Sequence, residues 1–395
     1  MGLIQYYQFV IMKFFERHNV LFTFIAVAIA IKVVWVAWSC WDHGSFSKEK
    51  KEIFQRKDYL VDKVVVTPQR LLDEMPEEIG SQFQGEWALY SCSMLTEALS
   101  NMTKIYPDYD YEAKYIIDSL IQIVKSPEIR QYDIDRWGDD PLQTLDGQKS
   151  HLSYLSHLAW MIGNYRKISD DDKYDKLHHD LCKTLNRRIR QSKIFNIPTY
   201  PNEPIYVPDM MVAIVALSDY AELNNGKYKS TVDEWLKRAK SEWIDKPTGL
   251  LVSFISEDGE IYELLKGSYT ALNCFYLTKL DHDFAKDQYK KLKAKFRQDF
   301  IISGIKEYHD HFCLLGLDVD AGPIILNLSP TGTAFALGCA TYFSDSNFRT
   351  KLLKTAEIAG HTIEKEEKRH YLLADFALVG EAITLAMRTN HNRVL

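Results

Sequence analysis

One predicted helix carries a tyrosine and a histidine that could handle protons. In the segment LSYLSHLAW, His157 follows Tyr154 by three residues, a spacing that lets both side chains share one helix face. A neutral imidazole donates or accepts a proton near pH 7, so His157 is a candidate acid or base that Tyr154 could orient. A histidine at such a position is also compatible with an ordinary core residue, and that alternative stays open.

A carboxylate opens another predicted helix. Asp209 follows Pro208 at the start of MMVAIVALSDY, where the positive end of the helix dipole stabilises a negative charge. The preceding loop, IPTYPNEPIYVP, contains four prolines that exclude helix, and it brings Tyr200 and Tyr206 close in sequence. We expect Asp209 to exchange a proton with a bound molecule and the two tyrosines to line the wall. A plain helix-start charge is the alternative.

Two further acids lie in a turn. The stretch Asp318-Val319-Asp320-Ala321 is followed by Gly322 and Pro323, which predict a rigid turn. Neighbouring carboxylates push their pKa values apart, and this favours one acid and one base. We therefore expect Asp320 to act opposite Asp209, with Asp318 contacting the bound molecule. A turn that is merely capped by an aspartate is the alternative.

Three more side chains are candidate binding residues. Glu86 and Tyr90 are one helical turn apart, and Trp137 lies in the loop RQYDIDRWGDDPLQTLDG, which is rich in acids and aromatics. His309 and His311 resemble metal ligands by type, but no third ligand follows at a suitable spacing. No phosphate-binding or dinucleotide-binding glycine motif is present. We expect neither a metal nor a cofactor.

The elements that must position these residues form a repeated pattern. Mostly apolar helices are predicted to open at near-regular intervals, and more charged helices fill most of the gaps; the openings lie near Glu86, His151, Asp209, Gly267, Thr331 and Asp375. Apolar inner and amphipathic outer helices in alternation are typical of an all-α (α/α)6 toroid, with six inner helices, six outer helices and a pocket at one end. One small β-hairpin is predicted over residues 250–265, around Glu257-Asp258-Gly259.

The N-terminal part of the sequence has a different character. Residues 1–19 are predicted to be an amphipathic segment, residues 20–41 a transmembrane helix, residues 42–80 a charged connector and residues 81–390 the toroid domain. The span contains Lys32 as its single charge and is about as long as a hydrocarbon core is thick. A buried helix of a soluble domain is the alternative. We expect a single-pass membrane protein, and the flanking charges leave open the side on which the toroid lies.

Composition narrows the partners. The 395 residues include 48 basic and 54 acidic side chains, mixed throughout, for a net charge of −6. Because no basic stripe stands out, a nucleic-acid partner is not expected. A small molecule is the expected partner, and a homo-oligomer is left open.

Two stretches resemble a known family. LSYLSHLAWMIGNY and IPTYPNEPIYVPD are similar to segments of the linalool dehydratase-isomerase family. The resemblance implies an (α/α)6 toroid and cofactor-free acid/base chemistry on terpene alcohols. It places the family's pocket histidine on His157 and its tyrosine on Tyr154, and it places two loop cysteines on Tyr200 and Asp209. The sequence keeps the nine-residue spacing of those cysteines but not the thiols.

These patterns lead to three functional hypotheses. The first is a membrane-anchored, metal-independent lyase, isomerase or hydratase that uses Asp209, Asp320, His157 and Tyr154 on a hydroxylated, terpenoid-like substrate. The second is a glycoside hydrolase or saccharide lyase that uses the same acids. The third is a membrane-tethered scaffold without catalysis. An apolar closed pocket favours the first hypothesis, and an open groove with aromatic platforms favours the second.

Overall fold

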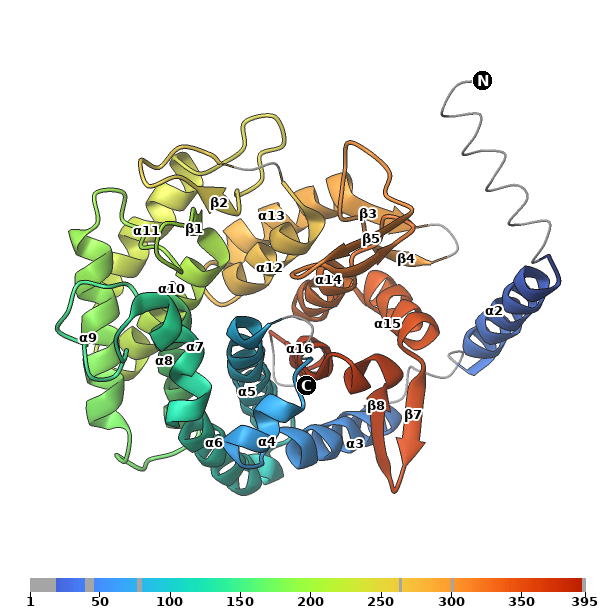
Figure 1. Ribbon diagram of the computed structural model, residues 1–395, viewed down its shortest axis with the longest axis horizontal. Coiled ribbons are helices and arrows are strands. Elements are labelled where there is room, and N and C mark those ends of the chain that lie inside the picture. Colours follow the sequence, from blue (N-terminus) through green and yellow to red (C-terminus); the bar gives the residue numbers. More distant parts are fainter. Residues whose placement is uncertain (1–18, 40–45, 77–79, 263–264, 300–301, 393–395) are drawn as a thin grey trace.

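The computed structural model describes residues 19–39, 46–76, 80–262, 265–299 and 302–392. In this part of the chain, six helices form a closed inner ring: α5 (Ser81–Ile105), α8 (Leu152–Lys167), α10 (Val207–Leu223), α12 (Gly267–Leu277), α14 (Pro330–Tyr342) and α16 (Leu378–Arg388). Each packs against the next, and α16 packs against α5 (Figure 1). The predicted openings lie close to the observed helix starts, and Gly267 coincides with one. The predicted toroid is therefore confirmed.

A second layer of helices surrounds the ring. Its members are α3 (Phe46–Val64), α6 (Asp110–Val124), α9 (Asp175–Gln191), α11 (Lys229–Ser241), α13 (His282–Phe296) and α15 (Ser346–Gly360). All residues of α12 are buried, whereas α9 is buried along one stripe that includes Leu181, Leu185 and Ile189. This contrast is expected, because an inner helix has neighbours on all sides and an outer helix faces water on one.

The outer helix α3 comes from the predicted connector. It packs against α5, α16 and strand β8 (Lys368–Tyr371). The Arg56 guanidinium is buried there, 2.7 Å from a carboxylate oxygen of Glu381, and Glu52 pairs with Arg388 at 2.9 Å. We call this group of buried ion pairs between α3 and α16 the seam. It fastens an N-terminal helix to the last helix of the ring.

Short strands decorate the ring. The described residues contain four antiparallel pairs: β1 (Ile205–Tyr206) with β2 (Phe254–Ile255), β3 (Arg297–Asp299) with β4 (Ser303–Ile305), β5 (Leu315–Asp318) with β6 (Gly322–Ile325), and β7 (Thr362–Lys365) with β8. The prediction of one hairpin is therefore wrong in number, because strands of two to four residues are too short to show an alternating pattern. The chain does reverse at Gly259, but β2 pairs with β1 instead.

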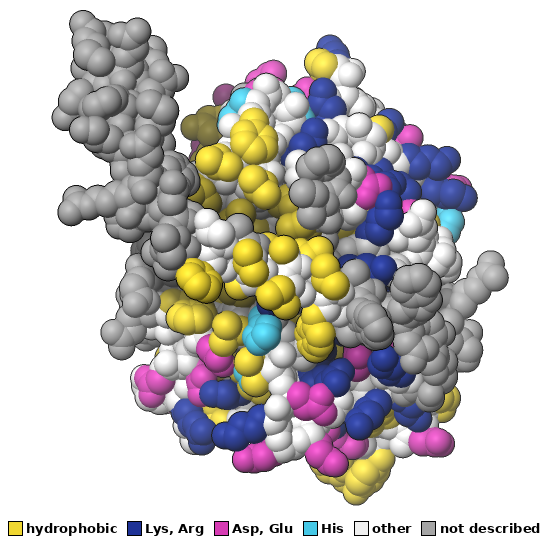
Figure 2. Space-filling model, turned by 90° about the vertical axis from the view of Figure 1, so that its right-hand side faces the viewer, with side chains coloured by type: hydrophobic (Ala, Val, Ile, Leu, Met, Phe, Trp, Pro, Cys, Tyr) yellow, Lys and Arg dark blue, Asp and Glu magenta, His cyan; other side chains and the backbone are white. Residues whose placement is uncertain are grey.

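Helix α2 (Asn19–Ser39) stands at the edge of the molecule and contacts α15 (Figure 1). Phe24, Ile31 and Trp35 are more than half exposed, and Figure 2 shows hydrophobic side chains gathered on the side of the molecule where α2 lies. Over the described residues, no helix is found that is both long and apolar enough to cross a membrane, so the predicted span is not confirmed. The described part of the chain does not include the last two residues of the predicted span, 40–41. It also does not include residues 1–18 of the predicted amphipathic segment.

Candidate active site

The candidate site lies where helices α5 and α10 begin, at one end of the ring. Asp209 is in the first turn of α10, and Glu86 and Tyr90 are in the first half of α5. Asp209 is only 2 % exposed, whereas Glu86 and Tyr90 keep part of their surface accessible. Part of the cluster is therefore exposed to solvent, while Asp209 lies beneath it.

Asp209 accepts hydrogen bonds from two neutral hydroxyl groups. The Tyr90 hydroxyl donates to Oδ1 at 2.9 Å, and the Thr199 hydroxyl donates to Oδ2 at 2.9 Å. Burial raises the pKa of Asp209 to about 6, helped by the negative charge of Asp320, although both hydroxyl donors act to lower it. The carboxylate is thus mostly ionised at neutral pH but remains basic enough to take up a proton.

Glu86 is the second carboxyl of the cluster. Burial raises its pKa to about 8, and the charges of Asp209 and Asp320 act in the same direction. The Tyr200 hydroxyl and the Arg136 guanidinium oppose this shift. Glu86 is therefore mostly protonated at neutral pH, while Asp209 is mostly ionised. Two carboxyls with unequal proton affinity can serve as acid and base in one reaction.

Aromatic side chains connect Asp209 to the β5–β6 turn. The Tyr206 ring lies 5.4 Å from the Tyr269 ring and 4.9 Å from the Phe254 ring, measured between centroids. The Tyr269 hydroxyl in turn donates to Oδ2 of Asp320 at 2.7 Å. Asp320 is exposed at the turn, so it forms the rim of the cluster.

Asp318 has a different place from the one predicted. Its Oδ1 accepts the backbone N–H groups of Asp320 at 2.9 Å and Ala321 at 3.0 Å, and its Oδ2 lies 3.1 Å from Nζ of Lys266. These partners occupy the carboxylate. Asp318 therefore shapes the turn that presents Asp320, as the capped-turn alternative supposed.

His157 lies behind the carboxylates. Its Nδ1 is 2.8 Å from the Ser93 hydroxyl, and its ring centroid is 4.3 Å from that of Tyr90. The side chain is completely buried, and this burial lowers its pKa to about 3. A neutral imidazole that packs on Tyr90 can position this tyrosine against Asp209.

The structure contradicts the predicted place of Tyr154. Its hydroxyl donates to the Val124 carbonyl at 3.0 Å, at the end of the outer helix α6. Three residues of α-helix leave roughly 60° between two side chains, and here this angle turns His157 toward α5 and Tyr154 toward α6. Tyr154 therefore joins two helix layers and is not part of the cluster.

Trp137 packs on a different group of side chains from Asp209 and Glu86. Its ring centroid is 5.4 Å from that of His151, whose Nε2 is 2.9 Å from Asp139. Its neighbour Arg136 is nearer to the cluster, because the guanidinium lies 4.4 Å over the Tyr200 ring. The sequence interpretation missed Thr199, Tyr269 and Arg136. Thr199 and Arg136 left a signal, since Thr199 stands in the same proline-rich loop as Tyr200 and Arg136 stands next to Trp137.

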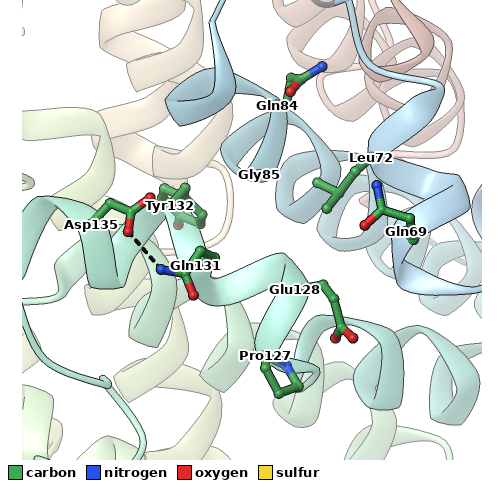
Figure 3. Close-up of a pocket in the computed structure, with 9 residues that line it drawn as sticks. All are labelled: Gln69, Leu72, Gln84, Gly85, Pro127, Glu128, Gln131, Tyr132 and Asp135. Atoms are coloured by element: carbon green, nitrogen blue, oxygen red, sulfur yellow. Dashed lines mark hydrogen bonds between the residues drawn. The ribbon is translucent and has the colours of Figure 1, made fainter.

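A surface pocket of about 400 Å³ has Gly85, the residue before Glu86, in its lining (Figure 3). It lies between α5, α7 (Pro127–Trp137) and the short helix α4 (Pro68–Asp73). Gly85 packs so closely on Tyr132 that an added Cβ would lie 2.8 Å from the tyrosine Cβ. The Tyr132 hydroxyl continues inward to the Ser153 hydroxyl at 3.1 Å. The lining residues are Gln69, Leu72, Gln84, Gly85, Pro127, Glu128, Gln131, Tyr132 and Asp135.

The chain resembles solved structures of helical carbohydrate-processing enzymes. It is similar to an unsaturated glucuronyl hydrolase specific for heparin, with 12 % identity and a TM-score of 0.53 over 87 % of this chain and 96 % of that one. A polysaccharide lyase aligns with 10 % identity and a TM-score of 0.44 over 76 % of this chain and 90 % of that one. No protein-family model and no curated protein matches the sequence. The resemblance to linalool dehydratase-isomerase therefore gains no support, and the similarity to the glucuronyl hydrolase shows a shared fold alone.

Proposed function

We propose that the protein is an acid/base enzyme that breaks or rearranges a bond in a saccharide, as a hydrolase or a lyase. The observation that carries this proposal is a buried carboxylate, Asp209, that lies close enough to Glu86 for its charge to help raise the pKa of that second carboxyl. Asp209 accepts from the neutral hydroxyls of Tyr90 and Thr199, and burial raises the pKa of Asp209 to about 6 and that of Glu86 to about 8. Both pKa values are therefore close to neutral pH, and a group transfers protons most effectively when its pKa is near the working pH.

In this proposal Glu86 is the general acid and Asp209 is the general base. Protonated Glu86 would donate its proton to the leaving oxygen of the substrate. Ionised Asp209 would accept a proton, either from an attacking water in hydrolysis or from a ring carbon in elimination. Tyr90 holds Asp209 in place through its 2.9 Å hydrogen bond, and His157 supports Tyr90 from behind.

The fold and the carboxyl pair both favour a saccharide substrate. The heparin-specific glucuronyl hydrolase has the same fold, and carboxyl pairs are the usual catalysts of glycosidic bond cleavage. The rings of Tyr206, Phe254 and Tyr269 lie together near Asp320 and are the kind of aromatic platform on which a sugar ring stacks. A terpenoid alcohol is the competing substrate.

A direct test is turnover of defined substrates. Purified protein would be incubated with neutral, amino and uronate oligosaccharides and with isoprenoid alcohols, and the products identified by mass spectrometry. We expect a saccharide product that Asp209→Asn and Glu86→Gln each reduce at least about 100-fold. Turnover of an isoprenoid alcohol alone would establish the competing hypothesis. Ligand binding without turnover, unaffected by Asp209→Asn, would indicate a scaffold.

We also propose that the N-terminal helix brings the protein to a membrane surface. The support is the exposure of apolar side chains on α2, which include Phe24 at 70 % and Val34 at 66 %. Such surfaces are rarely left in water. Cell fractionation of the full chain and of a chain lacking residues 1–45 tests this proposal: recovery of both in the same fraction would refute it.

A further inference from the structure

The pocket beside Glu86 has a chemical character that bears on the substrate. We infer that it binds a sugar unit that is uncharged or carries an amino group, and that it disfavours uronate and sulfated units. The inference deepens the proposed function and rests on it, because it assigns the pocket to a neighbouring unit of the saccharide that Glu86 and Asp209 cleave.

The pocket and the carboxyl pair share their wall. Gly85 and Tyr132 both line the pocket (Figure 3). Gly85 precedes Glu86 on α5, and the Tyr132 hydroxyl lies 3.1 Å from the Ser153 hydroxyl. Tyr132 is also near enough to Glu86 and Asp209 for both charges to raise the pKa of its phenol. A chain of sugar units bound at the carboxyl pair could therefore continue into the pocket.

The lining suits a polyhydroxylated ligand. Gln69 and Gln131 are exposed. Each amide donates one hydrogen bond to an aspartate, Asp73 at 3.0 Å and Asp135 at 2.6 Å (Figure 3), and keeps its second N–H and its carbonyl oxygen for sugar hydroxyl groups. Leu72 and Pro127 supply apolar surface for the C–H faces of a ring. A volume of about 400 Å³ is within the usual range of small-ligand sites.

Charge decides which sugars fit. Glu128 and Asp135 contribute carboxylates to the lining, and none of the described lining residues is a lysine or arginine. Arg136, the cation that acts on Glu86, has an acidic partner of its own in Glu203 at 2.9 Å. An anionic sugar unit would meet like charges here, whereas an ammonium group would meet opposite ones. This preference is opposite to that of a heparin-specific enzyme.

Binding measurements separate the two possibilities without requiring turnover. Isothermal titration calorimetry of the full chain would use tetramers of glucosamine, glucose and galacturonate as probes. We expect the glucosamine tetramer to bind tightest and the galacturonate tetramer at least about tenfold more weakly. Galacturonate as the tightest ligand, or no binding by any tetramer, would overturn the inference.

Two variants locate the binding. Leu72→Trp fills the pocket and should weaken tetramer binding at least about tenfold. Asp135→Lys reverses one charge and should narrow the difference between the glucosamine and galacturonate tetramers. Glu242→Lys makes the same charge change on the exposed end of α11, far along the chain, and should leave that difference unchanged. Equal responses to Asp135→Lys and Glu242→Lys would show that the pocket is not involved.

The proposed function can fail separately. If turnover depends on Asp209 but Leu72→Trp leaves tetramer binding intact, the pocket inference is wrong and the catalytic proposal stands. If tetramers bind in the pocket but no saccharide is turned over in an Asp209-dependent way, the catalytic proposal fails.

Discussion

Two parts of this molecule bury a carboxylate, one against a positively charged partner and the other against neutral hydroxyl groups. In the seam, the two oxygens of Glu381 accept from the Arg56 guanidinium at 2.7 Å and from the backbone N–H of Tyr371 at 2.9 Å. In the candidate active site, the two oxygens of Asp209 accept from the hydroxyls of Tyr90 and Thr199. Both acids are nearly inaccessible to solvent. Burial alone therefore does not distinguish a structural acid from a catalytic candidate.

The charge of the hydrogen-bond donor distinguishes the two acids. A guanidinium at direct contact distance keeps a carboxylate charged, so the pair can serve as a fixed clamp. Hydroxyl donors stabilise the anion less, so that burial and neighbouring acids can bring the pKa toward neutral pH. We conclude that buried acids without a cationic partner are where proton transfer should be sought in this fold.

The sharpest test of the comparison is to remove the charge at the site. Asp209→Asn keeps the size of the side chain and part of its hydrogen bonding to Tyr90 and Thr199, but an amide cannot accept the proton. Turnover should therefore fall by roughly 100- to 10,000-fold. The thermal unfolding temperature should change little, because the substitution weakens two hydrogen bonds but also removes the unfavourable burial of a charge. A large loss of stability with normal turnover per folded molecule would place Asp209 in the same class as Glu381.

The converse change breaks the seam. Arg56→Met leaves Glu381 buried without its cation and should reduce the free energy of unfolding by about 3–5 kcal/mol. Turnover per folded molecule should stay unchanged. Denaturant unfolding measures the effect, and the double variant Arg56→Met with Glu381→Gln should recover part of it. Unchanged stability in Arg56→Met would mean that the seam does not hold the ring together.

The pH profile sharpens the comparison further. Activity requires Asp209 ionised and Glu86 protonated, so kcat/KM should rise through a pH of about 6 and fall through about 8. Asp320→Asn removes a charge that raises both pKa values, so both limbs should move to lower pH by a fraction of a unit. If Asp320→Asn instead abolishes turnover, Asp320 is a reacting group, as the sequence interpretation supposed.

The same two groups should affect stability with a definite sign. Both folded pKa values exceed the ordinary values of 3.8 and 4.5, so the folded protein holds these protons to higher pH than the unfolded chain does. Their contribution to the free energy of unfolding therefore falls as the pH rises from about 4 to about 8. Glu86→Gln should be stabilised relative to the native protein toward pH 8, as thermal unfolding across this range would show.

The smallest effect is expected at Tyr154. Tyr154→Phe removes the hydrogen bond to the Val124 carbonyl and should cost about 1 kcal/mol of stability. Turnover should be unaltered, because this hydroxyl faces the outer layer. A loss of turnover comparable to that of Asp209→Asn would return Tyr154 to the catalytic group.

The inner ring could be predicted from sequence because its helices are apolar and open with recognisable residues, such as Pro208 before Asp209. Asp209 was identified for the same reason. The direction of Tyr154 could not be predicted, since a three-residue spacing does not determine which neighbour a side chain meets. Glu86 was expected to bind substrate. Its raised pKa depends first on burial and then on the charge of Asp209, and both follow from contacts with residues far away in sequence.

The seam also has a consequence for how the protein is made. Arg56 and Glu381 are 325 residues apart, so at 5–20 residues per second the ribosome adds the partner roughly 15–65 seconds after the arginine. During that interval α3 carries a cation that has no place to dock. The ring can close only when nearly the whole described chain has emerged, so a nascent toroid is exposed to aggregation and degradation until its final helix arrives.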